Sequence, residues 1–476
     1  MAVEWAGSGP ELLVTIDRAS GRGLRAQLEE QLRTAIRDGR LAGGEPLPSS
    51  RVLARALGLS RGLVQDCYAQ LQAEGYLTSR AGSATRVAAT ASLGLGEPPP
   101  RPREAPRCEI ADFAHGVPDL SLVPREDWAW AIREVCRTAP NSAFGYGEPA
   151  GARPLRQVLA SYLGRVRAVA ATPDDLIVCS GMQQSLGLVL AALDAPTIAF
   201  EDPGPGLPAP PGRSVPVPVD DEGLDVEALR RTGARAVLVT PAHQWPTGVV
   251  LSGPRRRQLI AWARECDGVI VEDDYDAEFR YDRDPVGSLQ GLAPDRVVSL
   301  GTVSKSLAPA LRLGWIVAPP RLLEPLARAK WLADRGSPGL DQLALATLIE
   351  SGRYDRHLRR VRSEYAARRE TLVEALTRHA PDLAVTGLAA GFHAVLHLPP
   401  GAGEARVADS GVVEARVVEA RVVEAAAGRG VGLYGMAGLR HRSQGAPPQL
   451  ILGFGNTPRG RIEPGIAAVA DLIAGK

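Results

Sequence analysis

Short apolar runs alternate with helix-like stretches through most of this 476-residue chain, and this alternation constrains the fold more than any other feature. The runs have four or five residues and lie at 176–179, 197–200, 236–240, 268–272, 297–301 and 314–318. Runs this short, rich in Val and Ile, indicate buried strands rather than helices. Strands that alternate with helices predict an α/β domain with a largely parallel sheet.

A proline-rich segment divides the chain. Residues 94–107, GLGEPPPRPREAPR, combine prolines and charges with no apolar periodicity, which is typical of a semi-rigid linker. We therefore predict a multidomain protein with a small domain over 12–90, a linker over 91–109 and a large domain over 110–476. Within the large domain, a long helical stretch followed by strands and another helix predicts a smaller lobe over approximately 350–476.

Composition excludes several classes of protein. No apolar run reaches the roughly 18 residues of a membrane span, and the N-terminus is acidic and unlike a signal peptide. The five cysteines are scattered and lack metal-ligand spacing, which is typical of reduced thiols in a cytoplasmic protein. We expect a cytoplasmic protein with no membrane partner and no metal site. Because the net charge is +1, any affinity for nucleic acid must come from a local patch.

The small domain has such a patch. The sequence predicts three helices, one over 23–41, one that starts at Ser49 and one that starts at Ser60, with a turn at Gly58 between the last two. Two helices joined by such a turn are typical of a helix-turn-helix, and residues 76–89 predict a β-hairpin wing. Between 46 and 90 there are five arginines and two acidic residues, an imbalance that favours phosphate contacts. Spacing alone leaves a plain helical bundle open as the alternative.

The segments GRLAGGEPLPSSRVLARALGLSRGLV and YLTSRAGSAT resemble the winged-helix domain of GntR-type regulators, over nearly all of residues 23–88. The resemblance implies an α+β winged helix-turn-helix that binds a double-stranded DNA operator. It also implies that Arg51, Ser60 and Arg61 meet phosphates and base edges, with Arg80 and Gly82 in the wing. Gly62, Leu63 and Ala84 depart from the usual pattern, so the base preference stays open.

Lys305 is conspicuous because only three of the 55 basic residues are lysines. An Arg guanidinium stays protonated, whereas a Lys amine can lose its proton and attack a carbonyl. Lys476 ends the chain, and Lys330 lies in a helix-like run where we expect it on a solvated face. Lys305 lies in SLGTVSKSLAPALRLGW, between two predicted strands, so it is a candidate nucleophile. A chance replacement of Arg by Lys is the alternative.

Two further segments, together with Arg312, complete a set of chemical groups. In CSGMQQSLGLVL a helix follows a strand, so its N-terminus favours an anion, and Arg312 adds a second charge for a phosphate. VEDDYDAEF places carboxylates at a strand end. Pyridoxal phosphate needs an amine, an anion opposite its pyridine nitrogen, a phosphate cradle and a partner for its ring oxygen. The ordered set predicts a pyridoxal 5'-phosphate site at the carboxyl ends of the strands.

The same segments resemble the aspartate aminotransferase superfamily of fold type I, over roughly residues 110–474. The resemblance implies that Lys305 is the catalytic amine that attaches the cofactor, that Asp273 pairs with the pyridine nitrogen and that Tyr275 bonds the ring oxygen. It implies a phosphate site formed by Gly181, Met182, Thr302, Ser304 and Arg312. Tyr146, in FGYGEPAG, matches a tyrosine that reaches the partner subunit's phosphate, which implies a homodimer.

A GntR-type winged helix, a proline-rich linker and an aminotransferase-like domain in this order resemble the MocR/GabR regulators. The resemblance implies a transcription regulator whose second domain senses a small-molecule effector, either pyridoxal phosphate or an amino acid. An aminotransferase with an added DNA-binding domain, and a DNA-binding protein with an inert second domain, are the alternatives.

Three positions depart from the enzymes. Pro205 stands where an aromatic residue usually stacks on the cofactor, and Trp245 stands where Asn is usual. Ile451 stands where an Arg clamps the substrate carboxylate, and losing that bidentate contact removes the main orienting interaction for an amino acid. Arg440 and Arg442 could replace it, but nothing in the sequence fixes their direction. We therefore expect little or no transamination.

The segment VVEARVVEARVVEA, residues 412–425, repeats every five residues. Five matches neither helical period, so the apolar pair moves around a helix. We predict a surface helix without a chemical role.

Overall fold

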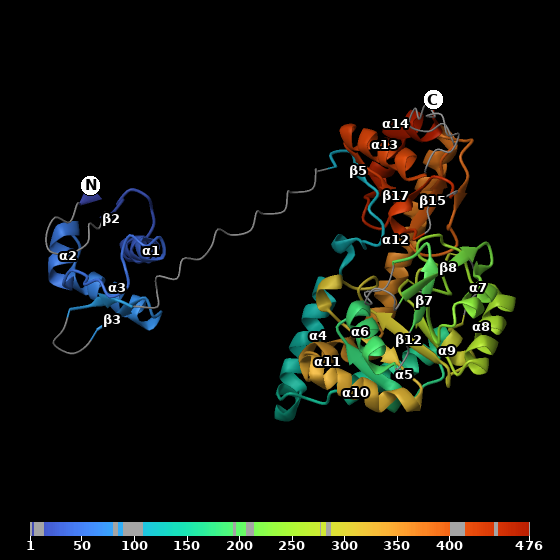
Figure 1. Cartoon of the computed structure of the whole chain (residues 1–476), viewed down its shortest axis with the longest axis horizontal. Helices are drawn as coiled ribbons and strands as arrows, with labels where there is room; N and C mark the ends of the chain where they lie inside the picture. The colour runs from blue at the N-terminus through green and yellow to red at the C-terminus, as the bar shows by residue number, and fades with distance from the viewer. Residues whose placement is uncertain are drawn as a thin grey trace. The chain divides into compact units, whose positions relative to one another are not determined.

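The computed structural model describes residues 2–3, 14–79, 84–88, 108–193, 197–205, 214–276, 278–281, 287–399, 415–441 and 446–475. The chain divides into two compact units, Met1–Ala105 and Pro106–Lys476, which Figure 1 shows in blue and in the remaining colours. The division falls within the predicted linker 91–109, of which 91–107 lie outside the described residues.

The described residues of the first unit form three helices and two small two-stranded sheets. The helices are α1 (Leu24–Arg37), α2 (Ser50–Leu57) and α3 (Arg61–Ala73), and the antiparallel strands are β3 (Leu77–Thr78) with β4 (Arg86–Val87) and β1 (Ala2–Val3) with β2 (Val14–Thr15). Ser49 caps α2 and Ser60 caps α3, each accepting a backbone N–H, while Gly58 ends α2 at φ 61°. The predicted helix-turn-helix with a β-hairpin is confirmed. One apolar core joins the three helices to β3 and β4.

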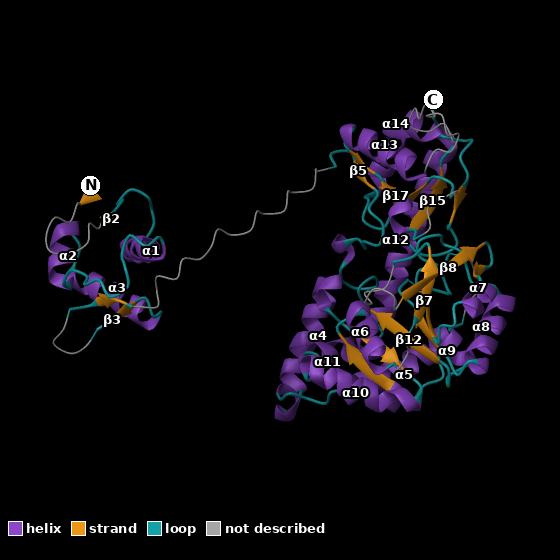
Figure 2. Cartoon of the chain, in the orientation of Figure 1, coloured by secondary structure: helices purple, strands orange, loops and turns teal. Residues whose placement is uncertain are grey.

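The second unit is built on an eight-stranded sheet, as Figure 2 shows in orange. Its order is β6 (Leu176–Cys179), β13 (Gly314–Val317), β12 (Val297–Thr302), β11 (Val269–Asp273), β10 (Ala236–Val239), β7 (Ile198–Asp202), β8 (Ser214–Asp220) and β9 (Gly223–Leu224). The pairs from β12 through β8 are parallel, and β13 runs antiparallel to both of its neighbours. The predicted, largely parallel α/β sheet is confirmed.

Helices cover both faces of this sheet. They are α4 (Arg125–Thr138), α5 (Arg153–Arg167), α6 (Met182–Ala192), α7 (Val226–Arg231), α8 (Gly253–Glu265), α9 (Leu289–Leu292), α10 (Pro320–Asp334) and α11 (Gly339–Glu350). Successive residues of a strand pack on opposite faces of the sheet. Val178 packs with residues of α5 and α11 on one face, and Ile177 packs with residues of α6 and α10 on the other. Short 3₁₀ helices lie at Leu120–Leu122, Asn141–Phe144, Pro173–Asp175, Pro309–Leu311 and Ala437–Leu439.

A smaller lobe follows the helix α12 (Arg353–His379). Its antiparallel sheet has the order β14 (Val385–Thr386), β15 (His393–His397), β18 (Gln449–Gly453) and β17 (Tyr434–Gly435), and its helices are α13 (Ala415–Gly428) and α14 (Arg459–Ala474). β5 (Ala111–Asp112) also joins this lobe, because it pairs with β16 (Val431–Gly432) and Phe113 lies in the lobe's core. α12 connects the two parts: Tyr354 packs against the large domain and Leu372 against the small lobe.

Two predictions about side-chain exposure are wrong. Lys330 is fully buried in α10, where its Nζ donates to Asp334 Oδ2 at 2.6 Å, to Ser337 Oγ at 2.7 Å and to Gln184 Oε1 at 3.1 Å. Three polar partners allow the ammonium to leave water. The VVEAR repeat is not wholly at the surface, because Glu419 of α13 is buried. Its carboxylate accepts hydrogen bonds from the backbone N–H of Gln449 in β18 and of Ala437 in the 3₁₀ helix Ala437–Leu439. Residues 412–414 of the repeat lie outside the described part of the chain.

No helix among the described residues is long and apolar enough to cross a membrane.

Candidate functional site

Lys305 lies in the loop that follows β12, at the carboxyl edge of the parallel strands. Its side chain is partly buried, and its Nζ donates to the backbone oxygen of Gly116, 2.5 Å away. Burial lowers the pKa of this amine, against the opposing charges of Asp273 and Asp276. A Lys with a lowered pKa is more readily present as the neutral amine, the form that condenses with an aldehyde.

The carboxylates of VEDDYDAEF have different partners. Glu272 accepts the first backbone N–H groups of α9, and so has a structural role. Asp274 forms a bidentate ion pair with Arg167, at 2.7 and 2.8 Å. Asp276 contacts Nδ1 of His243 at 2.7 Å. Each of these three carboxylates is therefore satisfied within the protein.

Asp273 differs, because it has no hydrogen-bond donor among the residues that the structure describes. It ends β11 and is partly buried. Desolvation, together with the charges of Asp274 and Asp276, raises its pKa to about 8, and Lys305 opposes this rise. A desolvated carboxylate without a donor is stabilised by a cation placed beside it. The protonated pyridine nitrogen of pyridoxal phosphate fits this requirement.

Three groups converge at the N-terminus of α6. This helix starts at Gly181, with φ 104°, and has no side-chain cap. A methyl group added at Gly181 would lie 3.4 Å from Arg312 Nη2 and 3.6 Å from Thr302 Oγ1, so the space beside the helix end is bordered by a guanidinium and a hydroxyl. Ser304 Oγ lies 2.8 Å from Thr302 Oγ1. Free N–H groups, including that of Met182, with a guanidinium and hydroxyls, are the donors that a phosphate requires.

Tyr275 lies between Asp273 and Asp276, with its hydroxyl 3.1 Å from Nδ1 of His243. Desolvation, followed by the charge of Asp276, raises its pKa well above the usual value, so the hydroxyl keeps its proton as a hydrogen-bond donor. The sequence patterns did not indicate a role for His243, which lies in TPAHQWPTG.

A second histidine, His115, lies beside Trp245, with ring centroids 5.6 Å apart. Burial and the charge of Lys305 lower the pKa of His115.

The structure describes most of the positions at which the sequence departs from the enzymes. Ile451 is fully buried in β18 and packs against Val395 and Met436, so an apolar side chain occupies this place. Arg440 donates to the Pro447 carbonyl at 3.1 Å and to the Gln449 side chain, which directs it toward residues of its own lobe. Pro205 is exposed, and Arg442 lies outside the described residues.

Tyr146 lies at the surface of the single chain. It follows the 3₁₀ helix Asn141–Phe144 and is 88% exposed, and Phe144 beside it is 55% exposed.

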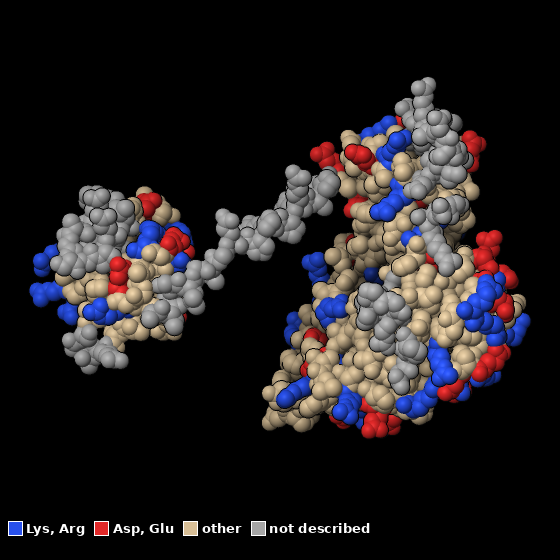
Figure 3. Space-filling model, in the orientation of Figure 1, with Lys and Arg blue, Asp and Glu red and all other residues tan. Residues whose placement is uncertain are grey.

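In the first unit, exposed arginines lie at the starts of two helices. Arg51 and Arg61 stand in the first turns of α2 and α3, and neither has an ion-pair partner in the part of the chain that the structure describes. On α1, by contrast, Arg25 pairs with Glu29 at 2.6 Å. Basic side chains line the edge of this unit where α2 lies (Figure 3). The Ser60 hydroxyl accepts the Leu63 N–H, and Arg80 and Gly82 lie outside the described residues.

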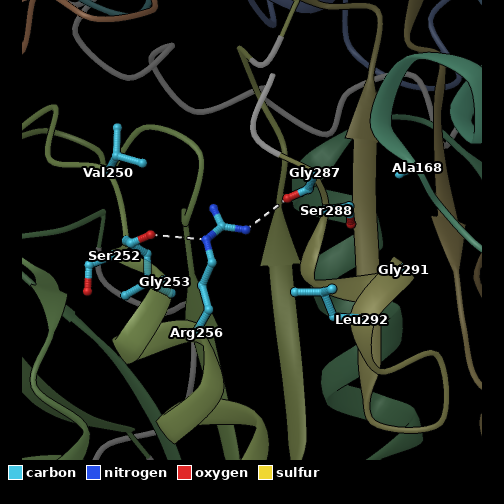
Figure 4. Close-up of a pocket in the computed structure, with 10 residues that line it drawn as sticks. Ala168, Val250, Ser252, Gly253, Arg256, Gly287, Ser288, Gly291 and Leu292 are labelled. Carbon is cyan, nitrogen blue, oxygen red and sulfur yellow. Dashed lines mark hydrogen bonds between the residues drawn. The ribbon is translucent and has the colours of Figure 1, made fainter. Parts of the chain in front are cut away.

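A cavity of about 590 Å³ lies elsewhere, between the start of α8 and α9 (Figure 4). Its guanidinium, from Arg256, donates to the backbone oxygens of Leu251, Gly287 and Pro241 at 2.8 to 3.0 Å. Because Nε and both terminal nitrogens each donate to one of these carbonyls, Arg256 holds the surrounding loops together. None of the predicted site residues lines this cavity.

Comparison with known proteins agrees with this geometry. Residues 24–87 match the model of bacterial regulatory proteins of the gntR family, and residues 109–422 match that of aminotransferase class I and II. The HTH-type pyridoxine biosynthesis transcriptional regulator PdxR of Corynebacterium glutamicum is 35% identical, over 81% of this chain and 86% of its own length. The probable rhizopine catabolism regulatory protein MocR of Rhizobium meliloti is 34% identical, over 78% and 80%.

Among solved structures, the kynurenine aminotransferase of Pyrococcus horikoshii superposes with a TM-score of 0.67 and 26% identity, over 78% of this chain and 91% of the enzyme. The gntR-family model thus matches within the first unit and the aminotransferase model within the second. With a GntR-type winged helix-turn-helix joined to a fold type I aminotransferase domain, the chain belongs to the MocR/PdxR-type family of transcriptional regulators.

Proposed function

We propose that this regulator binds pyridoxal 5'-phosphate at Lys305 and changes its affinity for operator DNA according to whether that pocket is filled. The DNA-binding function is assigned to residues 12–90 and the sensing function to residues 110–476. The observation that supports the cofactor most directly is Asp273, a desolvated carboxylate with a raised pKa and no donor among the described residues.

The residues divide the binding task. When bound, pyridoxal phosphate supplies an aldehyde for the Lys305 amine, whose pKa burial lowers. Asp273 offers a negative charge to the pyridine nitrogen, and Tyr275 offers a protonated hydroxyl to the ring oxygen. The N-terminus of α6, Thr302, Ser304 and Arg312 offer donors to the phosphate.

Pyridoxal phosphate itself is the proposed effector, ahead of an amino acid. An amino acid needs a cation for its α-carboxylate, and Ile451 gives an apolar side chain at the position of that cation. The relative from Corynebacterium glutamicum is a regulator of pyridoxine biosynthesis, which supports an effector of the same chemistry.

The active form is proposed to be a cytoplasmic homodimer. Tyr146 and Phe144 are large, adjacent and mostly exposed, which is unfavourable in water and is relieved by a second copy. In such a dimer Tyr146 would reach the phosphate of the partner subunit, as the family resemblance implies.

An aminotransferase that carries a DNA-binding domain is the second candidate, favoured by the superposition on a kynurenine aminotransferase. The two candidates differ in what the filled pocket does. The test is the visible absorbance of the purified full chain with pyridoxal phosphate, followed by addition of amino acids. A stable visible band that Lys305→Ala removes supports cofactor attachment. Loss of the band with each amino acid, accompanied by keto acid release, supports the enzyme.

A further inference from the structure

His243 joins Tyr275 to the small lobe. Its Nδ1 lies 2.7 Å from Asp276 Oδ2 and 3.1 Å from the Tyr275 hydroxyl, and its Nε2 lies 3.3 Å from the backbone oxygen of Gly387. Its side chain is fully buried. One ring therefore contacts two residues of the large domain and one of the small lobe.

The contact with Asp276 assigns one role to the ring. A carboxylate accepts, so the Nδ1 nitrogen that faces Asp276 is the donor in that hydrogen bond. Because Nδ1 donates, it does not accept the hydroxyl proton of Tyr275. The Tyr275 hydroxyl also hydrogen-bonds with Asp276, so His243 and Asp276 together fix the position of this hydroxyl.

The contact between the lobes is close and leaves no room for side chains. A methyl group at Gly391 would lie 2.4 Å from Asp276 Oδ2 and 2.6 Å from His243 Cε1, and one at Gly248 would lie 2.3 Å from the Cα of Gly387. Backbone hydrogen bonds also join the two sides, since Gly391 donates to the Phe279 oxygen at 2.7 Å. Movement of the small lobe would therefore act directly on His243 and Asp276.

We infer that His243 is a positioning residue that aims the Tyr275 hydroxyl at the cofactor and transmits the state of the pocket to the small lobe through Gly387. The inference rests on the proposed cofactor site. A cofactor that engages Tyr275 favours one arrangement of His243, and that arrangement favours one position of residues 387–391. The effector domain thus has a physical route from the cofactor ring to a segment more than 100 residues away in sequence.

The first experiment is a double-mutant cycle on the full chain, with the dissociation constant of pyridoxal phosphate and its visible absorbance maximum as readouts. His243→Gln removes the Nδ1 contact, and Tyr275→Phe removes the hydroxyl. Each single variant should weaken binding about fivefold, the effect of one hydrogen bond. In the Tyr275→Phe background, His243→Gln should change the constant by less than about twofold, because its target is already gone.

His393→Gln is the matched control. His393 is equally buried, its ring lies 4.9 Å from that of His243, and its Nε2 contacts the Pro246 oxygen instead of Tyr275. Equal losses from both histidine variants, or additive losses in the cycle, would overturn the inference. Failure of the wild type to bind the cofactor would instead refute the proposed function.

The second experiment measures amide hydrogen exchange of residues 387–391. It uses His243→Asn, so it does not depend on whether His243→Gln folds. Asn places its amide near the Nδ1 position of His but cannot reach Gly387. In the wild type, saturating pyridoxal phosphate should slow exchange in this segment at least threefold, and in His243→Asn this response should disappear. An unchanged response in His243→Asn, or none in a wild type that binds the cofactor, would show that the lobe is not coupled to the pocket.

Discussion

Replacing Asp273 with Asn should stabilise the cofactor-free protein, by an amount that increases with pH. In the folded chain, desolvation and the neighbouring Asp274 and Asp276 raise the pKa of Asp273 to about 8. In the unfolded chain the pKa is about 3.9. The folded state therefore binds this proton more tightly, so stability falls as the pH rises from about 4 to about 8 and falls no further above that.

The size of the effect follows from proton linkage. Where the folded state holds the proton and the unfolded state does not, stability falls by about 1.4 kcal/mol per pH unit. Between pH 5 and pH 7.5 this amounts to at most about 3 kcal/mol. Asn does not ionise, so the stability advantage of Asp273→Asn should grow by up to this amount over the same interval.

The assay is urea unfolding at a fixed protein concentration, followed by tryptophan fluorescence at pH 5, 6, 7 and 7.5. Six of the seven tryptophans lie after residue 105 and report on the second unit. Burial raises the pKa of Glu201 and Glu278 to about 7, and both proteins contain these groups. Glu201 also raises the pKa of Asp273, so the difference between the proteins reports Asp273 together with its interaction with Glu201.

A difference between variant and wild type that stays constant from pH 5 to pH 7.5 would refute the reasoning. Saturating pyridoxal phosphate should also remove most of the pH-dependent cost in the wild type, because Asp273 then has a cationic partner. Persistence of that cost with the cofactor bound would show that Asp273 does not face the pyridine nitrogen.

Three further predictions concern single groups. Lys305→Ala should abolish the visible band of bound pyridoxal phosphate without unfolding the chain, and Lys305→Arg should do the same, since a guanidinium does not condense with an aldehyde; an unchanged spectrum in either variant would exclude Lys305 as the attachment point. Gly181→Ala should weaken pyridoxal phosphate binding at least about tenfold, because φ 104° strains any other residue and the new methyl enters the space beside Arg312. Gly187→Ala on the same helix, where a methyl would meet nothing within 4 Å, should leave binding unchanged, and equal effects at the two glycines would contradict the phosphate site. Arg61→Ala should weaken specific DNA binding by about 1–3 kcal/mol, whereas Arg25→Ala, on the side already paired with Glu29, should have little effect; equal losses on specific and random duplexes, measured by fluorescence anisotropy across a salt series, would limit Arg61 to phosphate contact.

The fold was largely predictable from the sequence, because buried parallel strands are written as short uninterrupted apolar runs. Two strands of the eight-stranded sheet are missing from that prediction, β8 and the two-residue β9, and Pro216 and Pro218 of β8 argue against a central strand. β8 is tolerated near the edge of the sheet, between β7 and β9.

The candidate site was predictable only where residues directly follow predicted strands, because the carboxyl ends of those strands meet at one edge of the sheet. The segment that contains Lys305 and Arg312 could be associated with Gly181 through the carboxyl edge of the sheet, and the structure places Arg312 and Thr302 of this segment beside Gly181. The role of His243 could not be predicted, because its partners Asp276 and Gly387 lie 33 and 144 residues away. Lys330 was misjudged for the same reason, since a partner of its Nζ, Gln184, lies 146 residues away.

The most direct test of the regulator is the affinity of the full chain for its operator, with and without pyridoxal phosphate, at one salt concentration. The operator would first be selected by the full chain from random-sequence duplexes. We predict that the cofactor changes the dissociation constant at least about fivefold, the lower end of typical coupling between two sites, and that Lys305→Ala abolishes the change. Operator affinity indifferent to the cofactor, together with transamination at roughly 1 per second or faster, would contradict the sensor and establish an enzyme instead.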